Sequence, residues 1–580
     1  MTFKPNKGQT HQVHNQPTAL IGHNAYQQDK ILRHYVSAFY GRDDIALLND
    51  YGQLVGQELL HAGFDANKYK PEFVSHDRFG RRIDEVSYHP SYHQLMSAAM
   101  KAGHHSLPFK DHTSYQNTDE QLGSHVIRAA LTSLHTQADP GSGCPLTMTF
   151  AAVPAFQCSE SLAKVWLPKV LANRYEPDNK PYFEKSSVTI GMAMTEKQGG
   201  SDVRANSTVA FPLKKGEIPY SDSKEQVALA DVDEFELIGH KWFCSAPMCD
   251  AFLTLAYEDG HSQLSCFVVP RWRPDGTKNP MEIQRLKDKK GNISNASSEI
   301  EYRGAFAWRL GEQGKGVKTI IQMVGLTRFD CIVGSATLMH QATQQAVFHS
   351  KHRQAFGKTL IQQPLMQNVL ADLALESEAA MAIAFHTASC LQSGNEAFVR
   401  VASAVGKYWV CKRAAAHTAE AMECVGGVGL IGDSVFARLY TESPVNAIWE
   451  GSGNVQCLDV LRILQKDTNG LSSFLDEVGQ ALGLNNSFDN YFKQIPELLT
   501  KTLDNHIFAR RLVESMALAW QASVLLRFSG DTRLAELFIN SRLTGGHSGM
   551  FGTLLFETSK PYEAEETLRS IINRYELVTL

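Results

Sequence analysis

The stretch "SSVTIGMAMTEKQGGSDV", residues 186–203, decides the fold, because a strand pattern runs there into a polar loop that contains two glycines. The β-branched and small residues of its first half predict a strand, and the Gly-Gly pair predicts a tight turn after it. Small residues in such a loop let backbone N–H groups approach a ligand, and Thr195 and Ser201 add hydroxyl groups. The loop has neither a GxGxxG nor a P-loop pattern, so it is either another kind of cofactor loop or a plain β-turn.

The stretch opens a β-rich region between two helical ones. Short β-branched or aromatic runs follow it to about Arg309, separated by Gly, Asp and Pro clusters: "EFELIGHKWFCSA", "AFLTLAYE", "LSCFVVPR" and "SSEIEYRGAFAW". The segment "PLKKGEIPYSDSKEQ" is typical of a long, solvated hairpin loop. Helical periodicity precedes the region from about Gln27 and returns after "RLGEQGKGV". We expect a polar N-terminal extension lying loosely on the surface, a helical domain, a β-barrel, a helical bundle and a further helical domain, at residues 1–25, 26–185, 186–310, 311–465 and 466–580.

The composition is that of a globular protein with several domains. The 580 residues exceed what one core can hold, and 43% hydrophobic with 20% charged residues are ordinary values. A net charge of −5 gives no general attraction to nucleic acid or membranes, so such a partner would need a local patch. Ten cysteines occur singly, without a CxxC pair, which is typical of reduced thiols in a cytoplasmic protein. We expect no signal peptide and no membrane span.

Several other motifs are weak when taken one at a time. "HKWFCSA", residues 240–246, is a cofactor platform or an ordinary core strand, and "SKHRQAFGK", residues 350–358, is a basic helix end. "ECVGGVGL", residues 423–430, is a glycine helix stop or a phosphate site. His89 and His93 have the i, i+4 spacing of metal ligands, but they lack the accompanying HExxH glutamate, so we predict surface histidines and no metal.

The stretch "AIWEGSGNVQCLDVLR", residues 447–462, places a carboxylate between an indole and a run of small residues. Glu450 is either a catalytic base or a residue that starts a helix. A base that removes a carbon-bound proton needs a carboxylate in an apolar pocket, because burial raises its pKa and strengthens it.

The order of these motifs is more specific than any one of them. The series "MTEKQGGSD", "KWFCS", "RLGEQGKG", "LTRF", "RQAFGK", "ECVGGVG" and "WEGSGNVQ" resembles the acyl-CoA dehydrogenase family of flavoproteins. The sequences of three segments resemble the AidB branch of that family: "MTEKQGGSDVRANST", "RLKDKKGNISNASSEIEY" and "IWEGSGNVQCLDVLR". That branch is associated with the adaptive response to DNA alkylation. The resemblance covers almost the whole chain. It implies an acyl-CoA dehydrogenase-like fold, with a central β-barrel, a four-helix bundle and an extra C-terminal helical domain, assembled as a homotetramer.

The resemblance also implies FAD between barrel and bundle. Arg353 and the Gly426–Gly427 turn would reach FAD from a neighbouring subunit. The residues implied as cofactor contacts are Met192, Met194, Thr195, Gly200, Ser201, Phe243, Cys244, Ser245, Arg353, Ile448, Trp449, Gly451, Ser452, Gly453 and Asn454.

In this family a glutamate in a Glu-Gly-Thr context removes the α-proton of an acyl thioester while the β-hydride goes to flavin. Glu450 occupies that place, and Arg328 of "LTRF" matches an arginine near the substrate entrance, with a structural salt bridge as its alternative. Two positions depart from the family pattern: Trp449 replaces a tyrosine and Ser452 replaces a threonine. Glu450 is therefore a candidate base, and the alternative is an inherited residue that only shapes the flavin pocket.

The last block, residues 466–580, extends beyond ordinary family members, and in the AidB branch it binds double-stranded DNA. It carries 11 Lys and Arg against 14 Asp and Glu, so binding would need a patch assembled in three dimensions and directed at the DNA backbone. The alternative is that these arginines are solvated helix faces. The candidate DNA contacts are Arg462, Arg510, Arg511, Arg527, Arg533 and Arg542.

Three functions fit the sequence. The first is an FAD-containing, double-stranded-DNA-binding flavoprotein that protects against DNA alkylation, with weak or unidentified acyl-CoA dehydrogenase activity. The second is a metabolic dehydrogenase for short or branched acyl-CoA, with Glu450 as the base. The third is a protein that holds FAD only as a structural ligand.

Overall fold

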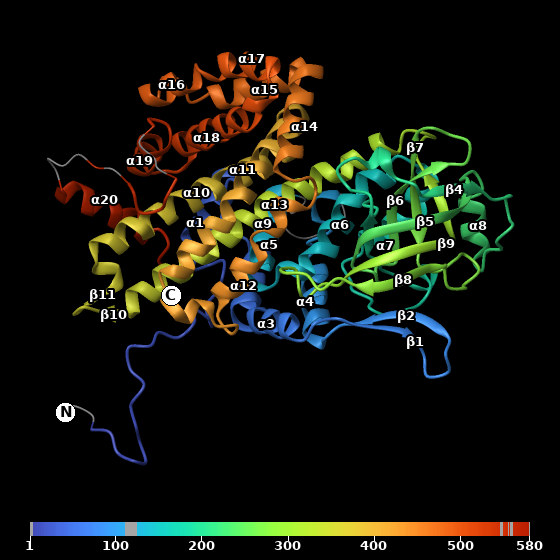
Figure 1. Cartoon of the computed structure of the whole chain (residues 1–580), viewed down its shortest axis with the longest axis horizontal. Coiled ribbons are helices and arrows are strands. Elements are labelled where there is room, and N and C mark those ends of the chain that lie inside the picture. Colours follow the sequence, from blue (N-terminus) through green and yellow to red (C-terminus); the bar gives the residue numbers. More distant parts are fainter. Residues whose placement is uncertain (1–3, 111–123, 546–548, 555, 557–560, 579–580) are drawn as a thin grey trace.

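The computed structural model of the chain describes residues 4–110, 124–545, 549–554, 556 and 561–578. A block of long helices lies in the middle, a β domain lies at one end, and the last helices lie on the other side of the block (Figure 1). The order of helices, sheet, long helices and final helices confirms the predicted fold class.

The N-terminal region is mainly helical, as the sequence predicts. Its helices are α1 Lys30–Tyr40, α2 Ala46–Leu54, α3 Leu60–Lys68, α4 Pro90–Lys101, α5 His125–Ala138, α6 Pro140–Phe156 and α7 Glu160–Val170. The helical prediction missed one antiparallel hairpin, formed by β1 Glu72–His76 and β2 Arg82–Ser87. Strand β1 has no buried residue, so its sequence lacks the clear apolar alternation that would have revealed it.

The β domain contains the predicted strands and two that the sequence did not reveal, β4 and β8. Its elements are β3 Ile190–Ala193, β4 Val209–Pro212, α8 Ser223–Ala228, β5 Glu234–Ser245, β6 Ala251–Glu258, β7 Leu264–Pro270, β8 Met281–Leu286 and β9 Ser297–Leu310. The predicted loop between β4 and β5 connects antiparallel neighbours and contains the short helix α8.

Two long strands close the sheet into a barrel. Strand β9 pairs with β5 along one side and with β8 and then β7 along the other. Strand β6 pairs with β7, and on its other side with β3 and β4, so the ring runs β6–β4–β5–β9–β7–β6. Strand β7 is buried along its whole length, which fits a sequence that is apolar apart from Ser265.

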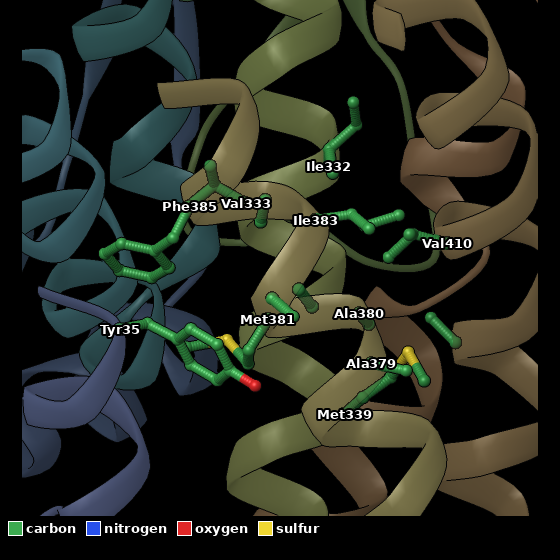
Figure 2. Close-up of a cluster of buried hydrophobic side chains, with 14 of the residues drawn as sticks. Tyr35, Ile332, Val333, Met339, Ala379, Ala380, Met381, Ile383, Phe385 and Val410 are labelled. Atoms are coloured by element: carbon green, nitrogen blue, oxygen red, sulfur yellow. The ribbon is translucent and has the colours of Figure 1, made fainter. Parts of the chain in front are cut away.

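The bundle is built on three long helices, α9 Gly316–His352, α10 Pro364–Gln392 and α11 Glu396–Glu423. Alanine, methionine and β-branched residues of these helices interlock with Tyr35 of α1 in one apolar core (Figure 2). Helix α11 ends just before the "GGVG" run, as predicted. Within the described ranges, no helix combines the length and the apolar character needed to cross a bilayer.

Shorter elements connect the bundle to the final block. They are the two-residue strands β10 Gln354–Ala355 and β11 Lys358–Thr359, followed by α12 Val435–Glu442, α13 Val445–Ile448 and α14 Gly453–Lys466. The last helices are α15 Thr468–Gly479, α16 Asn486–Phe492, α17 Ile495–Asp504, α18 Ala509–Phe528, α19 Thr532–Arg542 and α20 Pro561–Asn573. Trp520 of α18 is fully buried and donates from Nε1 to His386 Nδ1 of α10 at 3.2 Å. The final helices therefore share one apolar core with the bundle.

The N-terminal extension is tied to the bundle by several hydrogen bonds instead of lying loosely on the surface. The side-chain amide of Asn15 pairs with the backbone of Gln354, donating to its carbonyl at 2.8 Å and accepting from its N–H at 2.7 Å. Asn15 adopts a left-handed conformation, which asparagine tolerates better than most residues. A single side chain thus acts as a strand partner for the β10–β11 hairpin.

Candidate active site

The loop after β3, residues 194–203, is anchored by Glu196. Its buried carboxylate accepts hydrogen bonds from Lys241 Nζ at 2.8 Å, Thr208 Oγ1 at 2.6 Å and the backbone N–H of Ser207 at 2.6 Å. Burial raises the pKa of this carboxyl, but the charge of Lys241 and the hydrogen bonds outweigh burial and lower the pKa to about 2. Glu196 is therefore a fixed anion that holds the loop on the barrel.

Strand β5 lies beside this loop. The backbone N–H of Trp242 donates to the carbonyl of Thr195 at 2.7 Å, so the predicted strand and loop form one edge of the barrel. The Phe243 side chain is 47% exposed, whereas Cys244 is buried. Lys287 Nζ lies 3.1 Å from the ring centroid of Trp242 and 4.8 Å from that of Phe243. This edge presents a flat aromatic ring beside a cation and hydroxyl groups.

Glu450 lies in the turn between α13 and α14, so it does not start the helix. Its φ is 57° and that of Gly451 is 98°. Thr327 Oγ1 of α9 donates to Glu450 Oε2 at 2.8 Å. Burial raises the pKa of Glu450, while the Thr327 hydrogen bond and the charges of Lys407 and Arg328 oppose the rise. The arrangement is a carboxylate on a fixed turn, with a pKa pushed toward that of a useful base.

Trp449 precedes the candidate base and is held by two successive hydrogen bonds. Its Nε1 donates to Asn446 Oδ1 at 2.8 Å, and Asn446 Nδ2 donates to Ser335 Oγ at 3.1 Å. The indole packs against the apolar cluster of the barrel. The departure from tyrosine therefore places a locked ring at the junction of barrel and bundle.

Cys144 of α6 connects the Glu450 turn to the barrel edge. Its buried thiol lies near Ser245 of β5 and within electrostatic range of Glu450. Ser245 Oγ is in turn 3.1 Å from Ser297 Oγ. Burial raises the pKa of Cys144 to about 12, so the thiol stays neutral beside the carboxylate. The end of β5, helix α6 and the Glu450 turn thus face one another.

The remaining predicted cofactor contacts surround these surfaces. Met192 and Met194 pack against the barrel cluster, and Gly200 lies so close to Thr195 that a Cβ would come within 2.4 Å of its hydroxyl oxygen. Ser201 is exposed on the same loop. Ser452 is at the N-cap position of α14 without a capping hydrogen bond, Gly453 begins that helix, and Ile448 is 69% exposed before the turn. The first group thus lies on the barrel and the second at the turn between α13 and α14.

Arg328 is engaged in the salt bridge that the sequence left as its alternative role. Its guanidinium is 2.6 Å from Asp459 Oδ2 of α14 and donates from Nε to the Glu450 carbonyl at 3.2 Å. Arg328 therefore positions the turn. We assign it no direct contact with a substrate.

Arg353 lies away from the junction within one chain. Its guanidinium donates to the Asn15 carbonyl and to Gln16 Oε1. In the same hairpin Phe356 is 99% exposed, and the turn at Gly426 and Gly427 begins a short 3₁₀ segment. The structure of one chain brings neither Arg353 nor this turn to the Glu450 site.

Two of the six candidate DNA contacts are engaged inside the protein. Arg542 is buried and pairs with Asp372 and Glu376 of α10, so its selection as a DNA contact was wrong. Arg527 is only 11% exposed at its side chain and pairs with Glu477.

The other four are exposed and differ in their partners. Arg462 pairs with Asp459, Arg510 donates to Asn454 Oδ1 at 2.9 Å, and Arg533 lies 3.5 Å from Glu566. Across the described ranges, Arg511 makes no ion pair and lines a cleft between α17 and α18.

The two histidines with metal-ligand spacing have separate structural roles. His89 caps α4, where its Nδ1 accepts from the backbone N–H of Ser91 at 3.3 Å. His93 Nδ1 is 2.9 Å from the Tyr175 hydroxyl.

Sequence reasoning missed several residues of the site. Thr327 precedes Arg328 in the "LTRF" motif and could have been found from that neighbour. Lys407 interrupts an apolar helical run, "VASAVGKYWVC", and that isolated charge was its signal. Lys241 lies within the "HKWFCSA" stretch, but neither it nor Cys144 gave a signal of its role, because only the tertiary structure brings each of them to its partners.

A barrel beside a helical bundle, with a glutamate turn at their junction, defines the acyl-CoA dehydrogenase class of flavoproteins, for which FAD is the cofactor. Three family descriptions match the chain: "Adaptive response protein AidB N-terminal domain" at residues 15–177, "Acyl-CoA dehydrogenase, middle domain" at 191–305 and "Acyl-CoA dehydrogenase, C-terminal domain" at 314–465. The chain is also 39% identical to the putative acyl-CoA dehydrogenase AidB of Escherichia coli (strain K12) over 562 residues, covering 93% of this chain and 99% of that protein. The chain belongs to the AidB branch of the acyl-CoA dehydrogenase family.

More distant relatives share the fold. The chain is 28% identical to acyl-CoA dehydrogenase family member 11 of Caenorhabditis elegans, over 89% of this chain and 85% of that protein. A structure of a Caenorhabditis elegans acyl-CoA dehydrogenase in complex with C11-CoA superposes with a TM-score of 0.80 at 24% identity, covering 98% of both chains. A Bacillus anthracis acyl-CoA dehydrogenase complexed with FAD gives 0.64 at 16% identity, covering 94% of this chain and 93% of that chain.

Proposed function

We propose that the chain is an FAD-dependent oxidoreductase that dehydrogenates an acyl-CoA thioester, with Glu450 as the base that removes the α-proton. One observation carries this proposal: the Glu450 carboxylate stands on a fixed turn at the junction of barrel and bundle, where burial raises its pKa. The C11-CoA bound in the Caenorhabditis elegans relative supports an acyl thioester as the substrate class.

The residues at the junction fit FAD. The exposed ring of Phe243 and the exposed side chain of Ile448 offer apolar contacts to a flat ring, while the hydroxyls of Thr195, Ser201 and Ser245 offer hydrogen bonds to its polar edge. The loop that carries Thr195 and Ser201 is held to the barrel by Glu196 through buried bonds. When bound, FAD supplies the acceptor for the two electrons of the β-hydride.

The chain's own residues handle the proton. The Glu450 carboxylate takes the α-proton onto one of its oxygens, and its raised pKa makes that transfer more favourable than for an exposed carboxylate. The Thr327 hydroxyl donates to Oε2 at 2.8 Å, which orients the carboxylate and limits the rise of its pKa. The indole of Trp449, held by Asn446, packs against the barrel next to the carboxylate.

Anaerobic flavin bleaching tests the proposal. Purified protein with bound FAD is mixed with butyryl-CoA or C11-CoA, and the flavin absorbance is followed. We expect bleaching by at least one thioester in the native protein and none in Glu450→Gln, with equal FAD content in both. Loss of FAD from Glu450→Gln would instead assign Glu450 a structural role in the flavin pocket.

We also propose that the chain associates with double-stranded DNA and protects it during alkylation stress. Support comes from the match to the domain described as that of an adaptive response protein, and from exposed arginines of α14, α18 and α19. Arg510 and Arg511 have the strongest claim, because no ion pair within the described part of the chain neutralises either of them. A salt titration of DNA binding by the native protein and by Arg511→Gln tests this. Phosphate contacts predict affinity that falls with salt and a smaller salt slope in the variant. Binding that is absent at low salt would refute it.

A homotetramer and a cytoplasmic location complete the proposal. Large apolar side chains are exposed near the two segments expected to reach a neighbouring subunit, including Phe356 at 99%, Leu365 at 85% and Leu430 at 71%. Light scattering would show a mass four times that of the chain, and a monomer would contradict the assembly.

A further inference from the structure

Lys407 is a buried lysine in the middle of α11. Only 1% of its surface is exposed, and the side chains around it on the helix are mostly small or apolar. Taking an ammonium group out of water is unfavourable unless a partner compensates. Within the described ranges Lys407 forms no ion pair, and its Nζ donates to the carbonyl of Gly451 at 2.6 Å. A buried charge with a single backbone partner, one residue from the candidate base, points to a role at that site.

The hydrogen bond of Lys407 is part of a set that fixes the turn. Glu450 has a left-handed φ of 57°, a conformation that a glutamate rarely adopts without outside support. The Glu450 carbonyl accepts from Arg328 Nε at 3.2 Å and from Gln456 Nε2 at 2.9 Å. The Gly451 carbonyl accepts from Lys407 Nζ at 2.6 Å and from Gln456 Nε2 at 2.9 Å. Because hydrogen bonds hold both carbonyls, the backbone of the turn is fixed, and so is the orientation of the Glu450 side chain.

Two cations approach the Glu450 carboxylate, and they differ in one respect. Arg328 of α9 is 2.6 Å from Asp459 of α14, a carboxylate that also pairs with Arg462, so the charge of Arg328 is partly neutralised. In the described part of the chain, no carboxylate lies at ion-pair distance from Lys407. Lys407 is therefore the stronger source of positive potential at the turn.

Two thiols also lie within electrostatic range of Glu450. Cys144 comes from α6 and Cys331 from α9, and burial raises the pKa of both. Both thiols are neutral near pH 7, so neither adds a charge that would offset the effect of Lys407 on the carboxylate. The balance at the carboxylate is between burial, which favours its protonated form, and the cations and Thr327, which favour the ionised form.

We propose that Lys407 is a positioning residue for Glu450: its buried ammonium holds the Glu450–Gly451 turn through the Gly451 carbonyl and keeps the carboxylate in the ionised form that accepts a proton. This role rests on the proposed function of Glu450 as a base. Lys407 acts through the turn and through its charge, and it does not itself touch the reacting atoms.

The test compares Lys407→Met and Lys407→Gln with the native protein, with Arg400→Met as the control. Arg400 is an exposed cation on the same helix that pairs with Asp467, so its removal changes the net charge equally without touching the turn. The first readout is the ionisation of Glu450, followed by pH-difference infrared spectroscopy and identified by the carboxyl band that disappears in Glu450→Gln. The second readout is the rate of flavin bleaching by butyryl-CoA as a function of pH.

Removing a cation raises the pKa of a neighbouring carboxylate, so both readouts should move to higher pH. We expect Lys407→Met and Lys407→Gln to titrate Glu450 about one pH unit or more above the native protein, the lower end of the effect of a nearby opposite charge. At a pH below both titrations, bleaching should therefore slow about tenfold in each variant. Arg400→Met should match the native protein in both readouts.

The two readouts separate the two proposals. If the native protein is not bleached by the thioester, the proposed function fails, while the infrared titration still tests Lys407. Titration of Glu450 at the native pH in both folded Lys407 variants would overturn the role of Lys407. If both substitutions prevent folding while Arg400→Met folds, Lys407 is a structural residue and the proposal is also overturned.

Discussion

Replacing Lys241 with methionine tests whether a buried ion pair holds the cofactor loop. The side chains of Lys241 and Glu196 have no exposed surface, and Nζ lies 2.8 Å from Oε1. Methionine has nearly the length of lysine but neither its charge nor its hydrogen atoms to donate. Glu196 would stay buried with its bonds to Ser207 and Thr208 but without a counter-charge.

The size of the effect follows from the pKa of Glu196. The folded protein lowers it from 4.5 to about 2, which corresponds to ~3 kcal/mol of stability at neutral pH. Because the folded pKa is the lower one, this contribution is complete above pH 4.5 and is lost as the pH falls toward 2. Breaking a buried pair by removing one partner costs about 3–5 kcal/mol. We expect Lys241→Met to lower the free energy of unfolding by ~3 kcal/mol at pH 7.

Urea unfolding followed by tryptophan fluorescence measures this change, and gel filtration followed by flavin absorbance measures retained FAD. The double variant Lys241→Met, Glu196→Met should recover part of the loss, because no unpaired charge remains. Lys164→Met, which breaks the exposed pair with Glu160, is the control and should change neither property. A Lys241→Met protein as stable and as rich in FAD as this control would refute the reasoning.

Three further substitutions follow from the same contacts. Thr327→Val removes the hydrogen bond to Glu450, so the pKa of Glu450 should rise. Bleaching by acyl-CoA should then begin at a pH about one unit higher, with FAD retained. An unchanged pH profile would contradict this. Arg542→Gln leaves Asp372 buried without its cation and should destabilise the fold by about 3–5 kcal/mol in urea unfolding, with the salt slope of DNA binding unchanged. Asn15→Ala removes the side-chain pairing with Gln354 but leaves the hydrogen bonds of Arg353, so limited proteolysis should cleave the N-terminal extension faster. Equal cleavage rates would contradict that role.

The strands and long helices were predictable because their sequences carry the right period. Strand β7 is apolar apart from Ser265, and α11 ends just before the glycines of the "GGVG" run. The β1–β2 hairpin was not predictable in the same way, since β1 alternates between exposed and half-buried residues without a buried apolar face. The pairing of Asn15 with Gln354 joins residues 339 apart in the chain, and no local pattern reports it.

The site likewise contains residues that local motifs revealed and contacts that they did not. The order of short motifs located the Thr195 loop, the Phe243 strand and the Glu450 turn. The contacts that give Glu450 its properties come from Thr327, 123 residues earlier, and Lys407, whose bond to Gly451 spans 44 residues.

The arginines of the final block show that charges counted in the sequence do not reveal which side chains are exposed. Arg542 looks like a surface charge in the sequence. Its burial depends on Asp372 and Glu376 of α10, which only the packed structure brings beside it.

Anaerobic reduction of the bound flavin by butyryl-CoA or C11-CoA, in the native protein and in Glu450→Gln with matched FAD content, tests the central claim most directly. A positioned general base contributes about 100-fold or more to the rate. The account predicts bleaching in the native protein and a rate lower by at least about that factor in Glu450→Gln. Equal rates in the two proteins, or a native flavin that neither thioester bleaches, would contradict it.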